Sequence, residues 1–239
     1  MEKGKHGEAF ILGIAIILGL AVLGYFVSNM AVSLKRSERT VTVKGLSERE
    51  VPADIAIWPI KFSEASNDLN DLSMALENKT SIVTDFLKAN GFSPDDISIS
   101  APNISDKLAQ GYVEPNKIKF RYLASETITV FTGNVDLARK TMKKLVDLGK
   151  RGIAIESQGY GTKTEFLFTK LNDIKPAMIE EATKNAREVA EKFAKDSNSI
   201  LGKKKHARQG QFSIADRDSN TPYIKKVRVV STVEYYLKD

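Results

Sequence analysis

The hydrophobic residues are first gathered into one long uncharged stretch near the N-terminus. Residues 9–32 read AFILGIAIILGLAVLGYFVSNMAV and contain no charged side chain. A helix rises about 1.5 Å per residue, so this stretch is long enough to cross a hydrocarbon layer of about 30 Å. It is hydrophobic on every face, whereas a helix packed on a soluble core carries a polar stripe. The sequence therefore predicts a transmembrane anchor at 9–32, between a short tail at 1–8 and a polar linker at 33–39.

The residue pattern alone decides neither whether this segment is cleaved nor how it is oriented in the membrane. The tripeptide Ala31-Val32-Ser33 is compatible with signal-peptidase cleavage, but the apolar run is longer than the roughly 7–15 residues of a secretory signal, so we expect an uncleaved anchor. Basic residues flank both ends of the run, and the positive-inside rule therefore gives a tie. The flanking residues are Lys3 and Lys5 before the run, and Lys35, Arg36 and Arg39 after it.

After the linker, the polar and apolar positions alternate between strand and helix periods. Strand alternation is found at 40–44, 53–63, 97–100, 118–132, 153–157, 204–215 and 225–237, with a short extension at 164–169. Helical spacing begins after the capping cluster at 66–68, after Asn134, and after Asn172 or Asp173, and it ends near Gly91, Gly149 and Asn198. Residues 45–50 are expected to form a turn, and 102–117 a loop or hairpin tip. This order predicts one α+β domain over 40–239, with antiparallel sheets and helices packed on one face.

Two residues of the second predicted strand carry positional information. Pro59 cannot donate a ladder hydrogen bond, which predicts an edge position or a bulge. Trp58, the single tryptophan, is expected in the core or at a contact between copies of the chain.

Composition removes several classes of chemistry. The chain has no Cys and two His, which excludes disulfides, Cys-zinc sites, iron–sulfur clusters and thiol nucleophiles. A zinc-protease His pair, a phosphate-binding glycine loop and a nucleophile elbow are all missing from the sequence. The acidic pair Asp95-Asp96 and the segment 216–218 are interpreted as turn residues. We therefore assign no catalytic residue, no metal ligand and no cofactor, and we expect a protein that is not an enzyme.

The net charge of +6 is concentrated toward the C-terminal end. Its basic clusters define a candidate anion-binding patch, with a solvated strand face as the alternative interpretation. Aromatic interleaving of the kind found in nucleic-acid modules is missing, so no nucleic-acid partner is expected. The patch residues are Lys203, Lys204, Lys205, Arg208, Lys225, Lys226 and Arg228.

Four stretches in order resemble the SIMPL domain family, which includes the YggE-like proteins and a periplasmic immunogenic protein. They are TVTVKGLSEREVPADIAI at 40–57, GFSPDDISIS at 91–100, YLASETITV at 122–130 and EATKNAREVAEKFAKDSNSILGK at 181–203. The resemblance spans about residues 39–238 and implies a SIMPL-like α+β fold. It also implies a mostly non-enzymatic protein outside the cytoplasm, linked to the cell envelope and stress, in a family with ring-forming members. The long anchor and the basic stretch 203–208 depart from the family pattern.

Together, the residues and the resemblance predict an envelope protein anchored in the cytoplasmic (inner) membrane by one N-terminal helix. The resemblance resolves the charge tie by placing residues 35–239 in the periplasm or outside the cell. The expected role is an oligomeric scaffold or binding module, a homo-oligomer whose ligand the sequence does not identify. Two alternatives remain: a hydrolase built from Asp, Glu and Ser side chains, with Asp95 or Asp96 as candidates, and an anion-binding module that uses the basic patch.

Overall fold

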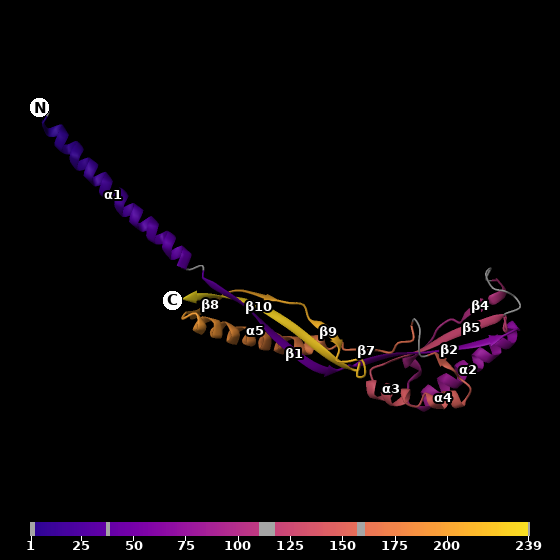
Figure 1. The fold of residues 1–239 in the computed structure, drawn as a ribbon. Helices are drawn as coiled ribbons and strands as arrows, with labels where there is room; N and C mark the ends of the chain where they lie inside the picture. Colours follow the sequence, from indigo (N-terminus) through magenta and orange to yellow (C-terminus); the bar gives the residue numbers. More distant parts are fainter. Residues whose placement is uncertain (1–2, 37–38, 110–117, 157–160, 239) are drawn as a thin grey trace. The chain divides into compact units, whose positions relative to one another are not determined.

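The computed structural model describes residues 3–36, 39–109, 118–156 and 161–238 (Figure 1). The chain divides into two compact units. The first unit comprises Met1–Glu48, Lys175–Ser213 and Arg228–Asp239, and the second comprises Arg49–Ile174 and Ile214–Val227. Each unit has its own cluster of buried hydrophobic side chains. The single domain expected over 40–239 stays a prediction.

The predicted anchor lies within one continuous helix, α1 (Lys3–Arg36). Its segment Gly13–Met30 is long and apolar enough to cross a membrane, and none of that segment is buried against the rest of the chain. The helix also includes residues 33–36 of the predicted linker, while residues 37–38 lie outside the described residues. Residues 3–8 of the predicted tail are likewise helical.

The second unit is built on a six-stranded antiparallel sheet. Its strands are β2 (Ile55–Ser66), β3 (Ile97–Ile99), β4 (Asn103–Asp106), β5 (Tyr122–Thr132), β6 (Ile155–Glu156) and β7 (Glu165–Leu167). The central pair is β2 and β5, which are in register from Ala56 opposite Thr132 to Ser66 opposite Tyr122. Strands β3 and β4 pair with β5, and β6 and β7 pair with β2.

Helices cover one face of this sheet. They are α2 (Leu69–Ala89), α3 (Val135–Met142) and α4 (Val146–Lys150), and Figure 1 shows all three on the same side of β2 and β5. The predicted caps are confirmed: Asp68 accepts hydrogen bonds from Asn70 and Asp71, and Asn134 accepts one from Leu137. Alternate residues of β2 and β5 point into a core that includes Trp58, whose core position is thereby confirmed.

The first unit contains most of a smaller antiparallel sheet with the order β1-β10-β8, in which β9 also pairs with β10. The bounds are β1 (Thr40–Pro52), β8 (Ile200–Gln209), β9 (Ser213–Asp216) and β10 (Ile224–Lys238). The long helix α5 (Leu171–Asp196) runs beside these strands (Figure 1). Its alanines 186 and 190 pack with Val43, Val233 and Tyr235.

Gly45 explains why the expected turn at 45–50 is replaced by uninterrupted strand. A Cβ atom at this position would lie 1.9 Å from the carbonyl oxygen of Ala182 and 2.4 Å from the backbone nitrogen of Ala186. Only glycine permits this approach of strand to helix. The glycine therefore marks a close packing contact inside β1, and the turn prediction was wrong.

Other boundaries differ for equally local reasons. The expected strand 204–215 is two strands, β8 and β9, interrupted at Gly210, whose N–H donates to the carbonyl of Val230. The expected helix up to Gly149 is divided between α3 and α4, and α5 begins at Leu171, one residue before the predicted cap. The expected loop 102–117 contains β4 and the short helix η2 (Lys107–Ala109), while 110–117 lie outside the described residues.

The sequence predicted an edge position or a bulge at Pro59, but β2 pairs on both sides and its register with β5 runs through Pro59 without a shift. Pro59 falls between the residues that pair with β7, 55–57, and those that pair with β6, 61 and 62. A missing N–H is tolerated at such a gap in the ladder.

Candidate anion-binding groove

The exposed part of β8 forms one side of a groove in the first unit. Helix α5 packs against side chains of β1 and β10, whereas every residue of β8 after Gly202 is exposed. The resulting groove has a volume of about 720 Å³. Leu201 and Tyr235 supply apolar surface, and charged side chains from α5, β8 and the end of β10 supply the rest.

The register between β8 and β10 determines which lysines reach this groove. Lys204 is opposite Tyr235, a buried residue that packs with Ala186 and Ala190 of α5, so Lys204 lies on the helix-facing side. The pairing shifts on both sides of Tyr235, as it does at β-bulges, where an extra residue re-aims the side chains that follow. Gly202 and Lys203 both line this groove, although successive residues of a regular strand point to opposite faces of the sheet.

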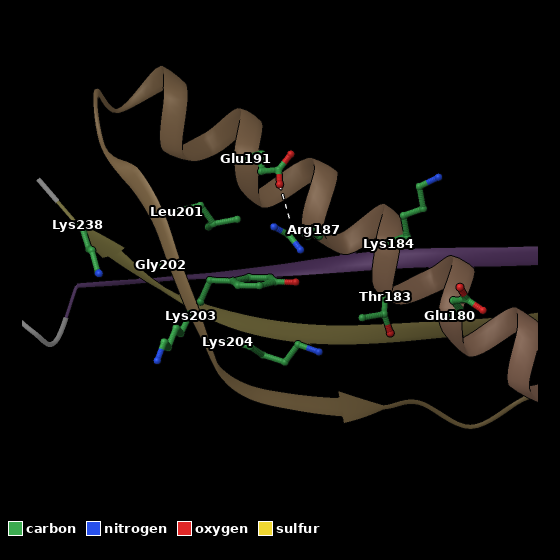
Figure 2. Close-up of a pocket in the computed structure, with 11 residues that line it drawn as sticks. Glu180, Thr183, Lys184, Arg187, Glu191, Leu201, Gly202, Lys203, Lys204 and Lys238 are labelled. Atoms are coloured by element: carbon green, nitrogen blue, oxygen red, sulfur yellow. Dashed lines mark hydrogen bonds and ion pairs between the residues drawn. The ribbon is translucent and has the colours of Figure 1, made fainter.

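Helix α5 contributes side chains that share one helical face, at positions 180, 183, 184, 187 and 191. Arg187 donates through Nε to Glu191 at 3.0 Å, and Figure 2 shows this pair on the helix side nearest the strands. Lys184 is directed away from the strands in the same view, and Thr183 toward them. Five lining residues are basic, against the acidic Glu180 and Glu191: Lys184, Arg187, Lys203, Lys204 and Lys238.

One carboxylate beside the groove, Glu234, is held in its ionised form. A side-chain hydrogen bond from Thr40, together with the ammonium of Lys205, lowers the pKa of Glu234. Burial raises the pKa of the Tyr235 phenol, which therefore stays neutral at neutral pH. The groove thus combines a neutral aromatic surface with an excess of positive charge, an arrangement that favours an anionic ligand.

The structure divides the patch predicted from sequence. Lys203 and Lys204 line the groove. Lys205 does not, because it pairs with Glu234 at 3.2 Å and its ammonium lies 5.6 Å from the ring centre of Tyr236. Arg208 is opposite Thr232 and outside the groove lining.

The C-terminal part of the predicted patch is different again. Lys225 is buried and its ammonium contacts the carboxylate of Asp216, so this lysine is a structural ion pair of the second unit. Lys226 and Arg228 are both exposed on β10. Lys226 belongs to the second unit and Arg228 to the first. Neither lines the groove.

Three basic groove residues, Lys184, Arg187 and Lys238, were missed by the patch prediction. Their charge is spread along a helix and at the end of a strand, so no cluster appears in the linear sequence. The available signal was the helical spacing of Glu180, Lys184, Arg187 and Glu191, which places the four on one face.

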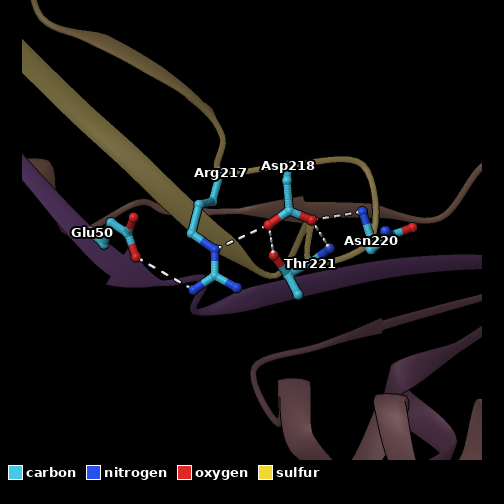
Figure 3. Close-up of polar contacts among 5 residues, drawn as sticks. All are labelled: Glu50, Arg217, Asp218, Asn220 and Thr221. Atoms are coloured by element: carbon cyan, nitrogen blue, oxygen red, sulfur yellow. Dashed lines mark hydrogen bonds and ion pairs between the residues drawn. The ribbon is translucent and has the colours of Figure 1, made fainter.

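The acidic segments predicted as turns form local caps. Asp96 accepts a hydrogen bond from the Ser93 N–H in η1 (Pro94–Asp96), and the Ser93 hydroxyl accepts one from the Asp95 N–H. Asp218 accepts from the Thr221 hydroxyl, from the backbone of Asn220 and Thr221, and from Arg217 (Figure 3). These contacts lower the pKa of Asp218 to about 2, the Thr221 hydroxyl contributing most. Within the described ranges, no group of three or more His, Asp or Glu side chains is placed to hold a metal ion.

Comparison with protein families identifies the class. The sequence matches the family described as "SIMPL: Protein of unknown function (DUF541)" over residues 41–235. This match covers both compact units and most of the chain, so the protein belongs to the SIMPL family. The family resemblance inferred from the sequence is therefore confirmed, as is the α+β fold with antiparallel sheets and packed helices. A comparison with curated proteins gives no match.

Proposed function

We propose that this protein is a non-enzymatic binding module held at the cytoplasmic (inner) membrane by α1, with its SIMPL domain in the periplasm or outside the cell. The observation that carries the proposal is the apolar segment Gly13–Met30, none of which is buried within the chain. Apolar surface of that length and on every face is stable in lipid and costly in water. The family membership supports the placement outside the cytoplasm.

An uncleaved anchor and a removed signal sequence differ in the mass of the mature chain. The proposal predicts that the protein keeps residues 9–32, stays with the membrane fraction at alkaline pH and requires detergent for extraction. Mass spectrometry of the extracted protein checks this directly. A soluble product that begins near residue 34 would contradict the anchor.

The binding role is supported by the groove between α5 and β8. Its volume of about 720 Å³ lies in the size range of small-ligand sites, and its basic lining favours a ligand with more than one negative charge. Lys204 lines the groove. Arg187 contacts Glu191 through Nε, and its two terminal nitrogens take no part in that contact. Arginine presents such nitrogens to phosphate or carboxylate oxygens as a fork, and lysine acts as a point charge.

A matched pair of substitutions on β8 tests the groove against general surface charge. We expect Lys204→Gln to weaken the binding of inorganic pyrophosphate by about fivefold, since about 1 kcal/mol is typical of one partly exposed charge contact. Arg208→Gln removes the same charge from the same strand outside the groove and should leave binding within about twofold. The measurement is calorimetry on the full chain in uncharged detergent at two salt concentrations, with weaker binding at the higher salt. Equal losses in both variants would assign the affinity to net charge alone.

We further propose that the module self-associates. Within the described part of the chain, β1 pairs only with β10, so one edge of this strand of 13 residues is unpaired. Such edges favour strand addition by another chain. Light scattering and cross-linking of the full chain in detergent should reveal an oligomer whose population rises with concentration, and a strictly monomeric species at high concentration would contradict this.

A further inference from the structure

A buried carboxyl group interrupts the apolar inner face of β5 in the second unit. Alternate residues of this strand are buried beneath the helices, and among them Ala124, Ile128 and Val130 are apolar. Glu126 occupies the same face, opposite Phe62 in the register with β2, and only 7% of it is exposed. A carboxyl group at such a position is costly unless partners compensate for its lost hydration.

The compensation present within the chain is small. Among the described residues, the hydrogen bond to the Glu126 side chain comes from the Thr80 hydroxyl on α2. That hydroxyl also lies 2.9 Å from the carbonyl oxygen of Leu76, and its single hydrogen serves one acceptor at a time. No Lys, Arg or His side chain in the described ranges pairs with Glu126, although an ionised carboxylate accepts about four hydrogen bonds.

Glu64, on the same sheet, is a carboxylate that has a cationic partner. The ammonium of Lys79 lies 2.6 Å from Glu64 and also donates to the backbone carbonyl of Ser63. Lys79 precedes Thr80 on α2, yet its charge is committed to Glu64, whose pKa it lowers. Glu126 therefore lacks the kind of partner that its neighbour on β2 possesses.

Glu126 lines a cavity of about 340 Å³ between α2, β5 and the segment that leads into β4. Leu76, Pro102 and Ile104 give this cavity apolar walls, and Glu77, which is exposed, adds a second carboxylate. The lining contains no basic side chain. A small apolar cavity with one buried acid and one exposed acid is complementary to a cation that carries an alkyl chain.

We propose that this cavity is a binding site for an organic ammonium ion, with Glu126 pairing the ammonium and the apolar walls holding its alkyl chain. A calcium ion is disfavoured because it takes six to eight oxygen ligands, whereas three of the lining residues are apolar. The ammonium group has two sources, a free alkylamine or the lysine side chain of another protein. The site lies within the second unit and does not depend on the proposed membrane topology or on the basic groove.

Calorimetry on the full chain in uncharged detergent tests the site with n-pentylamine, 1,5-diaminopentane and calcium chloride as probes. We expect saturable binding of pentylamine and tighter binding of the diamine, whose second ammonium reaches Glu77. Glu126→Gln preserves shape and should weaken both amines at least tenfold. Glu77→Gln is the control: it should leave pentylamine within about threefold and remove the advantage of the diamine.

A second substitution keeps the test decisive if Glu126→Gln disturbs folding. Ile104 is 45% exposed, so we expect Ile104→Lys to be tolerated and to supply an ammonium from within the chain. This variant should raise the melting temperature and lose pentylamine binding, while Ile104→Met should retain it. Pentylamine binding that is absent in the wild type or unchanged in Glu126→Gln overturns the proposal, as does calcium binding that displaces the amine.

Nα-acetyl-lysine methylamide, which keeps a free side-chain ammonium, distinguishes the two sources of the ammonium group. Tighter binding than pentylamine assigns the cavity to a lysine of a partner protein, and weaker binding assigns it to a free amine. Either result is compatible with the ammonium site. If the ammonium site is disproved, the proposals of a membrane anchor and of a basic groove still stand, because their tests use different residues and different probes.

Discussion

The two compact units bury their residues in different ways. The second unit is filled by large side chains, among them Trp58, Phe62, Phe86 and Phe92. The first unit has a thinner core, in which two alanines of α5 meet Val43, Val233 and Tyr235. One unit gains stability from side-chain volume, and the other from the close approach of a helix to a strand. The difference predicts opposite sensitivities, to lost volume in one unit and to added volume in the other.

Loss of volume in the second unit should have the largest effect. Phe62 is fully buried, so Phe62→Ala is expected to lower the free energy of unfolding of that unit by about 3–5 kcal/mol. Denaturant unfolding in detergent, followed by Trp58 fluorescence, measures the change. Phe131→Ala on the neighbouring strand is the control, since Phe131 is 52% exposed and should cost about 1 kcal/mol or less. Equal losses in the two variants would contradict a core centred on Phe62.

Addition of a single methyl group in the first unit should come next. Gly45→Ala places a carbon atom against the backbone of Ala182 and Ala186, which cannot rotate away. We expect a loss of about 1–3 kcal/mol, measured by thermal unfolding followed by circular dichroism. Gly149→Ala is the matched control, because its new methyl group meets open space within a short helix and should be neutral or stabilising by about 0.5–1 kcal/mol. A neutral Gly45→Ala would refute the close strand–helix contact.

A polar contact between α5 and β1 should contribute less. Ser47 is buried, and its hydroxyl donates to the carboxylate of Glu181 at 3.0 Å. Ser47→Ala should therefore cost about 1 kcal/mol in thermal unfolding. Ser98→Ala, on an exposed position of β3, should change stability by less than half that amount. A larger loss of stability in Ser98→Ala than in Ser47→Ala would contradict a stabilising contact between Ser47 and Glu181.

Asp218 should give the smallest effect, visible mainly as a titration. Its pKa is lowered to about 2, so its contribution to stability is present above the unfolded value near 3.8 and is lost as the pH falls through about 2. Thr221→Ala removes the largest cause and should move the titration midpoint upward, toward 3.8. Carboxyl NMR measures the midpoint in the wild type and in the variant. An unchanged midpoint in the variant would exclude the Thr221 hydroxyl as the main cause.

The sequence predicted the elements whose pattern is long and local. The uncharged stretch 9–32, the alternation of 225–237 and the caps at Asp68 and Asn134 each depend on neighbouring residues alone. It failed where a distant contact decided the outcome. Gly45 suggested a turn, but α5 packs directly against it. Lys225 suggested a ligand contact, but it forms an ion pair with Asp216.

The candidate sites show the same limit. Lys203 and Lys204 were predicted, because a basic run is visible in the chain, but Arg187 entered the groove only through the packing of α5. Glu126 gave no sequence signal, since an acidic residue in an alternating strand is expected on the solvent face. The register with β2, fixed by both strands together, turns it inward.

Protease accessibility of residues 40–238 in spheroplasts and in lysed cells shows on which side of the membrane the SIMPL domain lies. We expect added protease to degrade this region in intact spheroplasts, while a cytoplasmic marker protein survives until lysis. In intact cells with a closed outer barrier, the region should be protected. Protection in spheroplasts that is lost only on lysis would place the SIMPL domain in the cytoplasm and contradict the proposed function.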